Sequence, residues 1–227
     1  MPCECSERVH ACRLVVLTGG PGAGKTAVLE VVRRAFCAHI VVLPEAATVL
    51  FGGGFPRHDT DAGRRAAQDA IFRVQRAMEA MVGDEQQAAV ALCDRGTVDG
   101  LAYWPAGIAA ACTQLGIDID AELARYEAVI HLRTPTAERG YDHSNPVRTE
   151  SGLAALALDA RILAAWQGHP RRIVIESEKD FLQKIAHAVA AIRDQVPACC
   201  RAHAIAELGE TPRSDGCSPH TLGVGRR

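Results

Sequence analysis

Eight consecutive residues have the types and spacing of a loop that wraps a polyphosphate. They are Gly19, Gly20, Pro21, Gly22, Ala23, Gly24, Lys25 and Thr26, and they fit the pattern G-x-x-x-x-G-K-T between an apolar run and an amphipathic segment. Glycines let backbone N–H groups approach an anion closely, and the N-terminus of the next helix favours negative charge. We expect Lys25 to reach the β- and γ-phosphates of ATP and Thr26 to bind Mg2+. The alternative is a glycine-rich turn that binds nothing.

A second acidic group, Asp94, ends the apolar run 88–93 and is followed by Arg95. We expect Asp94 to hold Mg2+, usually through water, and Arg95 to lie near a transferring or acceptor phosphate. The alternatives are a helix cap for Asp94 and a structural salt bridge for Arg95. Motor-type ATPases place a water-activating Glu directly after this Asp, so Arg95 argues against a motor.

A carboxylate, Glu45, ends the second apolar run, which we expect to form a strand neighbouring the strand before the glycine-rich loop. There it would accept the proton of an acceptor hydroxyl, which is the task of the general base in phosphoryl transfer. The alternative is a position beside the dipole of the next helix.

Several arginines gather in the polar stretch 133–150, among them Arg133, Arg139 and Arg148, with His143 nearby. We interpret this stretch as a lid whose arginines stabilise the charge on the transferred phosphoryl group and exclude water. A solvated loop of the same composition is the alternative for each arginine.

Aromatic residues and one amide follow the second and third apolar runs or lie on the long helix between them. Such groups can stack on and hydrogen-bond to a planar base or a nicotinamide ring. Core packing is the alternative for each, and the strongest one for Phe72. The set is Phe51, Phe55, Phe72, Gln75, Tyr103 and Trp104.

The elements that must position these groups alternate between short apolar runs and helical patterns. Five runs favour strands buried on both faces, which is typical of parallel sheets covered by helices. We therefore predict an α/β, three-layer fold with a five-stranded parallel sheet and an arginine-rich lid, with the candidate groups at the carboxyl ends of the strands. The strands are expected at 13–18, 39–43, 88–93, 128–132 and 172–175, and helices at 27–36, 61–82, 98–103, 106–116, 120–126, 153–166 and 181–192.

Composition bounds the rest of the prediction. The 227 residues, net charge of −2 and 48% hydrophobic content suit one domain and give no reason to expect nucleic acid or a membrane as a partner. We expect a flexible leader at 1–12, the domain at 13–195, a disordered tail at 196–227 and a soluble, cytoplasmic protein. The nine cysteines should be reduced, and the spacing of Cys3, Cys5, His10 and Cys12 disfavours zinc.

Four segments together resemble a known family: GGPGAGKT, LPEAA, CDRGTVDGLAYW and HLRTPTAERGYDHSNPVRTES. The chain is similar to the small AAA-type ATPase domains related to the ribosylnicotinamide kinase domain of NadR. The resemblance implies a P-loop, kinase-like core that uses ATP and Mg2+. Deoxynucleoside kinases are also similar, which implies roles for Glu45 as base, for the pair Asp94–Arg95, and for Gln75 at the base of the substrate. The chain has Asp-Arg-Gly where those kinases have Glu-Arg-Ser.

The leading hypothesis is an ATP-dependent kinase of a small hydroxyl-bearing acceptor, which we expect to be nucleoside-like. A nucleotide-dependent binding or regulatory ATPase without a metabolic acceptor is the alternative. A slow ATPase is disfavoured by the missing Glu after Asp94. A GTPase is disfavoured because Asn145, the only Asn, precedes a proline and cannot form the guanine-reading N-K-x-D segment. The sequence predicts neither the acceptor nor the oligomeric state.

Overall fold

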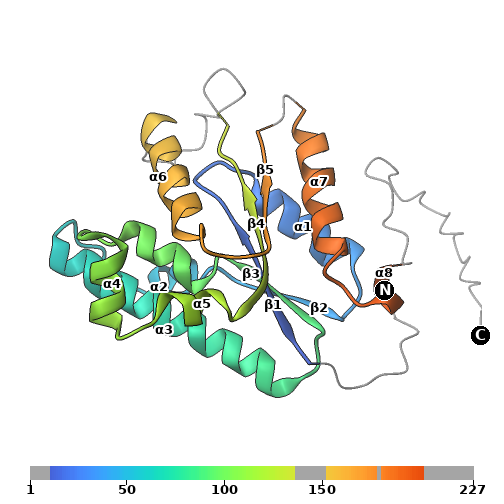
Figure 1. Cartoon of the computed structure of the whole chain (residues 1–227), viewed down its shortest axis with the longest axis horizontal. Helices are drawn as coiled ribbons and strands as arrows, with labels where there is room; N and C mark the ends of the chain where they lie inside the picture. Colours follow the sequence, from blue (N-terminus) through green and yellow to red (C-terminus); the bar gives the residue numbers. More distant parts are fainter. Residues whose placement is uncertain (1–10, 136–151, 178–179, 202–227) are drawn as a thin grey trace, which may run out of the picture.

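Five parallel strands form a single sheet in the computed structural model, which describes residues 11–135, 152–177 and 180–201. The sheet order is β2-β3-β1-β4-β5 (Figure 1). The five-stranded parallel α/β prediction is confirmed. The strands are β1 (Arg13–Thr18), β2 (Ile40–Leu43), β3 (Val90–Asp94), β4 (Tyr126–Leu132) and β5 (Arg172–Ile175).

Helices cover both faces of the sheet, which gives three layers (Figure 1). On one face, α1 (Lys25–Ala35) and α7 (Phe181–Arg193) pack on alternate residues of the strands, such as Val15 and Leu17. On the other face, Val16 and Cys93 contact the remaining layer. That layer contains α3 (Asp61–Glu85), the 3-10 helix η1 (Thr97–Tyr103), α4 (Gly107–Leu115), α5 (Ile119–Leu123) and α6 (Gly152–Ala165).

The position of β2 corrects one prediction. β3 lies between β1 and β2, so Glu45 does not follow a strand that neighbours the strand of the glycine-rich loop. Burial explains the order, because residues 90–93 are fully buried whereas 40–42 remain partly exposed. The run with complete burial suits an interior strand, and the shorter, half-buried run forms the edge.

The carboxyl-terminal boundary also differs from the prediction. The expected tail at 196–227 begins too early, since Val196 is fully buried against the α1–α7 face. A short helix, α8 (Ala198–Arg201), follows it. Hydrophobic contact with the sheet thus overrides the mixed local composition. Residues 202–227 lie outside the described residues, as do 1–10 of the predicted leader.

None of the described helices is both long enough and apolar enough to cross a membrane. Within the same described ranges, no three His, Cys, Asp or Glu side chains converge as metal ligands. Of the disfavoured zinc pattern, only Cys12 falls in these ranges, and it is a free cysteine.

Candidate active site

The glycine-rich loop connects β1 to α1, which begins at Lys25. Gly24 occupies the position before the helix with φ of 98°, a left-handed conformation that favours glycine. Gly19 has φ of 138°, and a Cβ there would collide with the carbonyl oxygen of Leu132. The glycines are therefore needed by the fold itself, in addition to any approach of a phosphate.

Three side chains from distant elements hold this loop in place. Asp159 on α6 accepts a hydrogen bond from the N–H of Gly20 at 2.9 Å. Thr134, just after β4, donates to the carbonyl of Pro21 at 3.1 Å. Lys184 on α7 donates to the carbonyl of Ala23 at 2.8 Å. None of these three anchoring residues was predicted, because no local pattern in the sequence signals them.

Lys25 folds back over its own loop. Its Nζ donates to the carbonyl oxygens of Gly19 at 3.0 Å and Gly20 at 3.4 Å. Burial, and then the positive charge of Arg95, lower the pKa of Lys25 to about 8. Thr26 is exposed at the start of α1. Both side chains have the loop-and-helix context that the phosphate-binding pattern requires.

Asp94 ends β3 directly beside Leu17 of β1. Its Oδ1 atom is buried and has no hydrogen-bond partner among the described residues. Burial raises the pKa of Asp94, while the charge of Lys25 opposes that rise. A buried carboxylate oxygen left unpaired suits a magnesium-bound water, so Asp94 and Thr26 fit the ion. The capping alternative is not seen, because the N–H of Gly96 is bonded to Asp99.

Glu45 and Arg95 form an ion pair at the carboxyl end of the sheet. Arg95 Nε donates to Glu45 Oε1 at 2.7 Å, and the hydroxyl of Thr48 donates to Glu45 Oε2 at 2.7 Å. Burial acts to raise the pKa of Glu45, but Arg95 and Thr48 together bring it below its usual value. Glu45 precedes α2 (Ala46–Gly52) without capping it, so its carboxylate is directed to Arg95 instead.

Arg95 also reaches the glycine-rich loop. Its backbone φ of 74° is unusual for a residue other than glycine. Its Nη1 donates to the carbonyl of Gly19 at 3.2 Å and to Asp99 Oδ1 at 3.4 Å. Burial disfavours the charged form, but Tyr103, Asp99 and Glu45 hold the pKa of Arg95 above its ordinary value. The guanidinium of Arg95 thus connects Glu45 to the glycine-rich loop. The alternative interpretation of Arg95, a structural salt bridge, describes the ion pair with Glu45.

Asp99 is a residue that the sequence analysis missed. It is buried and accepts hydrogen bonds from Thr18 Oγ1, from the N–H of Gly96 at 2.9 Å and from Trp166 Nε1 at 3.1 Å. These bonds tie the end of β1 to η1 and set the position of Arg95. The spacing of four residues between Arg95 and Asp99 could have suggested their ion pair. The bond between Asp99 and Trp166 could not be predicted, because Trp166 comes from a distant part of the sequence.

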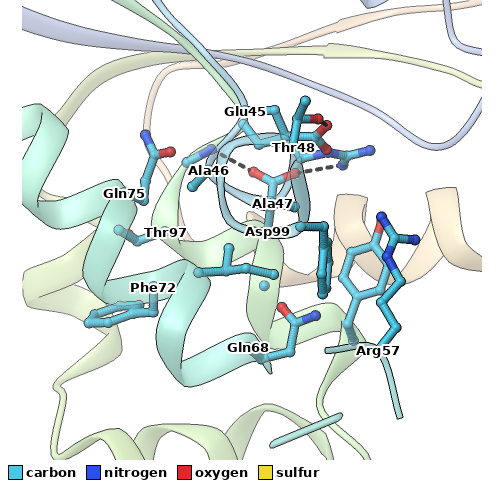
Figure 2. Close-up of a pocket in the computed structure, with 16 residues that line it drawn as sticks. Glu45, Ala46, Ala47, Thr48, Arg57, Gln68, Phe72, Gln75, Thr97 and Asp99 are labelled. Atoms are coloured by element: carbon cyan, nitrogen blue, oxygen red, sulfur yellow. Dashed lines mark hydrogen bonds and ion pairs between the residues drawn. The ribbon is translucent and has the colours of Figure 1, made fainter. Parts of the chain in front are cut away.

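A pocket of about 300 Å³ opens beside Glu45 and Arg95, between α2, α3 and η1 (Figure 2). Of the predicted ring-binding set, Phe51, Phe72, Gln75 and Tyr103 line it. Phe55 instead stacks edge-on against Phe51, and Trp104 is buried in the core. The lining residues are Glu45, Ala46, Ala47, Thr48, Phe51, Arg57, Gln68, Ile71, Phe72, Gln75, Arg95, Gly96, Thr97, Asp99, Gly100 and Tyr103.

Of the predicted lid, the structure describes Arg133, whose Nε lies 3.1 Å from Asp159 Oδ2. That ion pair places Arg133 beside the carboxylate that anchors Gly20. Arg139, Arg148 and His143 lie outside the described residues, and the lid stays a prediction.

Comparisons with known proteins agree with this geometry. A family model described as AAA domain matches residues 14–184. A structure of NadR in complex with NR aligns with a TM-score of 0.60 at 16% identity, covering 83% of this chain and 52% of that chain. The chain thus spans about half the length of NadR. Deoxyadenosine kinase from M. mycoides with bound dATP aligns with a TM-score of 0.56 at 13% identity, covering 79% and 98%. At such identities the likeness establishes a shared fold. No curated protein matches the sequence significantly.

Proposed function

This chain belongs to the AAA domain family, and we propose that it transfers the γ-phosphoryl group of ATP to a hydroxyl of a small nucleoside-like or cofactor-precursor molecule. One observation carries the proposal. Arg95 contacts both Glu45, on the wall of the pocket, and Gly19, in the glycine-rich loop. An acceptor in the pocket would therefore lie next to phosphates held by the loop. The NadR and deoxyadenosine kinase structures support the same arrangement through their fold.

In the proposed reaction, the acceptor hydroxyl gives its proton to the Glu45 carboxylate as its oxygen bonds to the γ-phosphorus. The bond from that phosphorus to the β,γ-bridging oxygen breaks, and ADP leaves with the bonding electrons. The lowered pKa of Glu45 keeps its carboxylate ionised at neutral pH, which is the form that a general base requires.

The remaining roles concern charge. Loop N–H groups and Lys25 hold the triphosphate, and Arg95 lies where it can neutralise charge on the transferred group. Mg2+, when bound by Thr26 and Asp94, would screen the phosphate oxygens. We assign the same charge-stabilising task to Arg133, Arg139 and Arg148.

The pocket favours this proposal over a nucleotide-dependent binding protein without an acceptor. A regulator needs its nucleotide loop and a partner surface, whereas this chain has a partly apolar pocket whose carboxylate, Glu45, is paired with Arg95. Such a pocket is the usual form of a small-molecule site.

The test measures ADP formation and phosphorylated product with MgATP and a panel of nucleosides and cofactor precursors. We expect one class of acceptor to raise ADP formation at least tenfold over the basal rate, with one phosphorylated product for each ADP. If no acceptor stimulates turnover while MgATP binds normally, the regulatory alternative replaces the proposal.

A further inference from the structure

A network of buried charges adjoins the pocket through Gln75. Its centre is Glu79 on α3, which is 2% exposed and accepts from three donors. Arg125 donates to Oε2 at 2.6 Å, while the hydroxyl of Tyr126 and the amide nitrogen of Gln75 donate to Oε1, each at 2.8 Å. Both carboxylate oxygens of Glu79 are thus engaged.

The partners of Glu79 keep it an acceptor. Arg125 supplies a permanent positive charge next to it. Burial, and then the charge of Glu79, raise the pKa of Tyr126 well above its ordinary value, so the phenol keeps its proton. The oxygen of Tyr126 in turn accepts from the N–H of Thr97 at 2.8 Å, which leaves its own O–H for Glu79.

This arrangement determines which end of the Gln75 amide faces Glu79. A carboxylate can only accept hydrogen bonds, so the amide nitrogen must face it, and a flip would bring two acceptor oxygens together. Gln75 is 2% exposed and lines the pocket (Figure 2). Among the described residues, the side-chain hydrogen bond of Gln75 is the one from its amide nitrogen to Glu79, so the amide oxygen stays open to the pocket. A ligand that fills the pocket without donating to this oxygen would leave it buried and unpaired, which is costly.

We propose that Glu79 acts as a positioning residue that fixes the Gln75 amide oxygen as an acceptor, so that the pocket selects planar rings carrying an amino or carboxamide N–H. Rings that present a carbonyl, ester or carboxylate oxygen at the same point would meet an acceptor and be disfavoured. The apolar walls formed by Phe72 and Ile71 suit a flat ring. The inference rests on the proposed function, because it names the class of acceptor for that site.

Matched ligand pairs test the inference. Adenosine is compared with purine riboside, which lacks the amino group, and nicotinamide riboside with the methyl ester of nicotinic acid riboside. Binding is measured by calorimetry, and phosphoryl transfer is measured separately as kcat/KM. In at least one pair, we expect the N–H-bearing member to be preferred by roughly 10- to 100-fold, the scale of a buried acceptor left unpaired.

Two variants and a control locate the preference. In Glu79→Gln the neighbouring amide accepts or donates, so the Gln75 amide is free to flip and the preference should fall toward onefold. Gln75→Leu should abolish it by removing the acceptor. The control, Gln68→Leu, removes another α3 amide from the same pocket and should leave the ratio within about threefold of the starting value. If Glu79→Gln proves unstable to heating, Gln75→Leu alone decides.

The outcomes separate the two proposals. Equal phosphorylation of both members of each pair overturns the inference and leaves the kinase proposal intact. Selective binding of N–H-bearing members without phosphorylation supports the inference and overturns the kinase proposal. A preference that persists in Gln75→Leu, or no binding by any N–H-bearing member, overturns the inference.

Discussion

The glycine-rich loop and the pocket beside it are built in opposite ways. The loop is one unbroken stretch, residues 19–26, which combines backbone N–H groups with the side chains of Lys25 and Thr26. The pocket is made of side chains from α2, α3 and η1. A loop separates α2 from α3 in the sequence, and β3 separates α3 from η1. Arg95 is where the two regions meet, because it contacts both Gly19 and Glu45.

The difference teaches how the two regions divide recognition. Backbone N–H groups donate to phosphate oxygens, which all nucleoside triphosphates share, so these groups do not distinguish one triphosphate from another. Side chains arranged in a pocket discriminate among acceptors, because their shape and polarity are particular. We therefore expect changes in the loop to affect nucleotide binding and changes in the pocket to affect the acceptor.

The largest effect should follow Lys25→Ala in the loop. Removing the cation that reaches the phosphates should lower kcat/KM for MgATP by about 10³-fold, the upper range for one electrostatic donor in a transition state. Acceptor affinity, measured by calorimetry without ATP, should stay within about twofold. Arg34→Ala is the control, on the same helix but with an exposed side chain. A large loss of acceptor affinity in Lys25→Ala would break the division between the regions.

A smaller loss, about 10²-fold in kcat, should follow Glu45→Gln in the pocket. Glutamine cannot take the acceptor proton, whereas the loop that binds ATP is unchanged, so the Kd for MgATP should stay within about threefold. Thr48→Val keeps the carboxylate and removes only its 2.7 Å hydrogen bond. Thr48→Val should lower kcat by less than about tenfold. Full phosphoryl transfer by Glu45→Gln would refute the assignment of the base.

The pH dependence of nucleotide binding should sharpen the contrast. Lys25 has a lowered pKa of about 8 in the nucleotide-free protein, and bound phosphates should raise it. The protonated form therefore binds ATP better. The affinity for MgATP should be at its maximum below pH 8, and above pH 8 it should fall with a limiting slope of about tenfold per pH unit. Calorimetry with MgATP between pH 7.5 and 9.5 checks this. Lys25→Arg keeps the charge and should remove the slope, and a flat wild-type profile would contradict the assignment.

The smallest effect should be the stability change in Asp159→Asn. This substitution weakens the contacts of the carboxylate with Gly20, His131 and Arg133 but preserves its shape. We expect the free energy of unfolding to fall by about 1–3 kcal/mol, measured by denaturant titration. Asp69→Asn, which affects only an exposed pair with Arg73, should change it by less than about 0.5 kcal/mol. Equal effects in both would mean that Asp159 does not anchor the loop.

Sequence reasoning succeeded where the information is local. Residues 19–26 form a contiguous pattern, and the strands appear as apolar runs because both faces of the sheet are covered. Glu45 and Asp94 were selected because strand ends converge at one edge of a parallel sheet. The structure places both after strands of this sheet, and their roles stay predictions.

It failed where a contact joins distant elements. The bond from Trp166 to Asp99, the anchoring of the loop by Lys184 and the choice of Glu79 to orient Gln75 all depend on tertiary packing. The prediction that β2 neighbours β1 failed for a related reason. The order of strands along the chain does not show which strand is buried most fully and therefore lies inside the sheet.

The central place of β1 has a consequence for folding during synthesis. β2 with β3 and β4 with β5 are pairs of consecutive strands, whereas β1 pairs only with β3 and β4. β1 precedes both of its partners in the sequence, so its pairing is complete only after β3 and β4 have been synthesised. Such long-range pairing closes late, because its loop entropy is lost before its contacts form. The ability to bind ATP should thus arise in the last folding step, and capture on immobilised nucleotide would select complete chains over truncated ones.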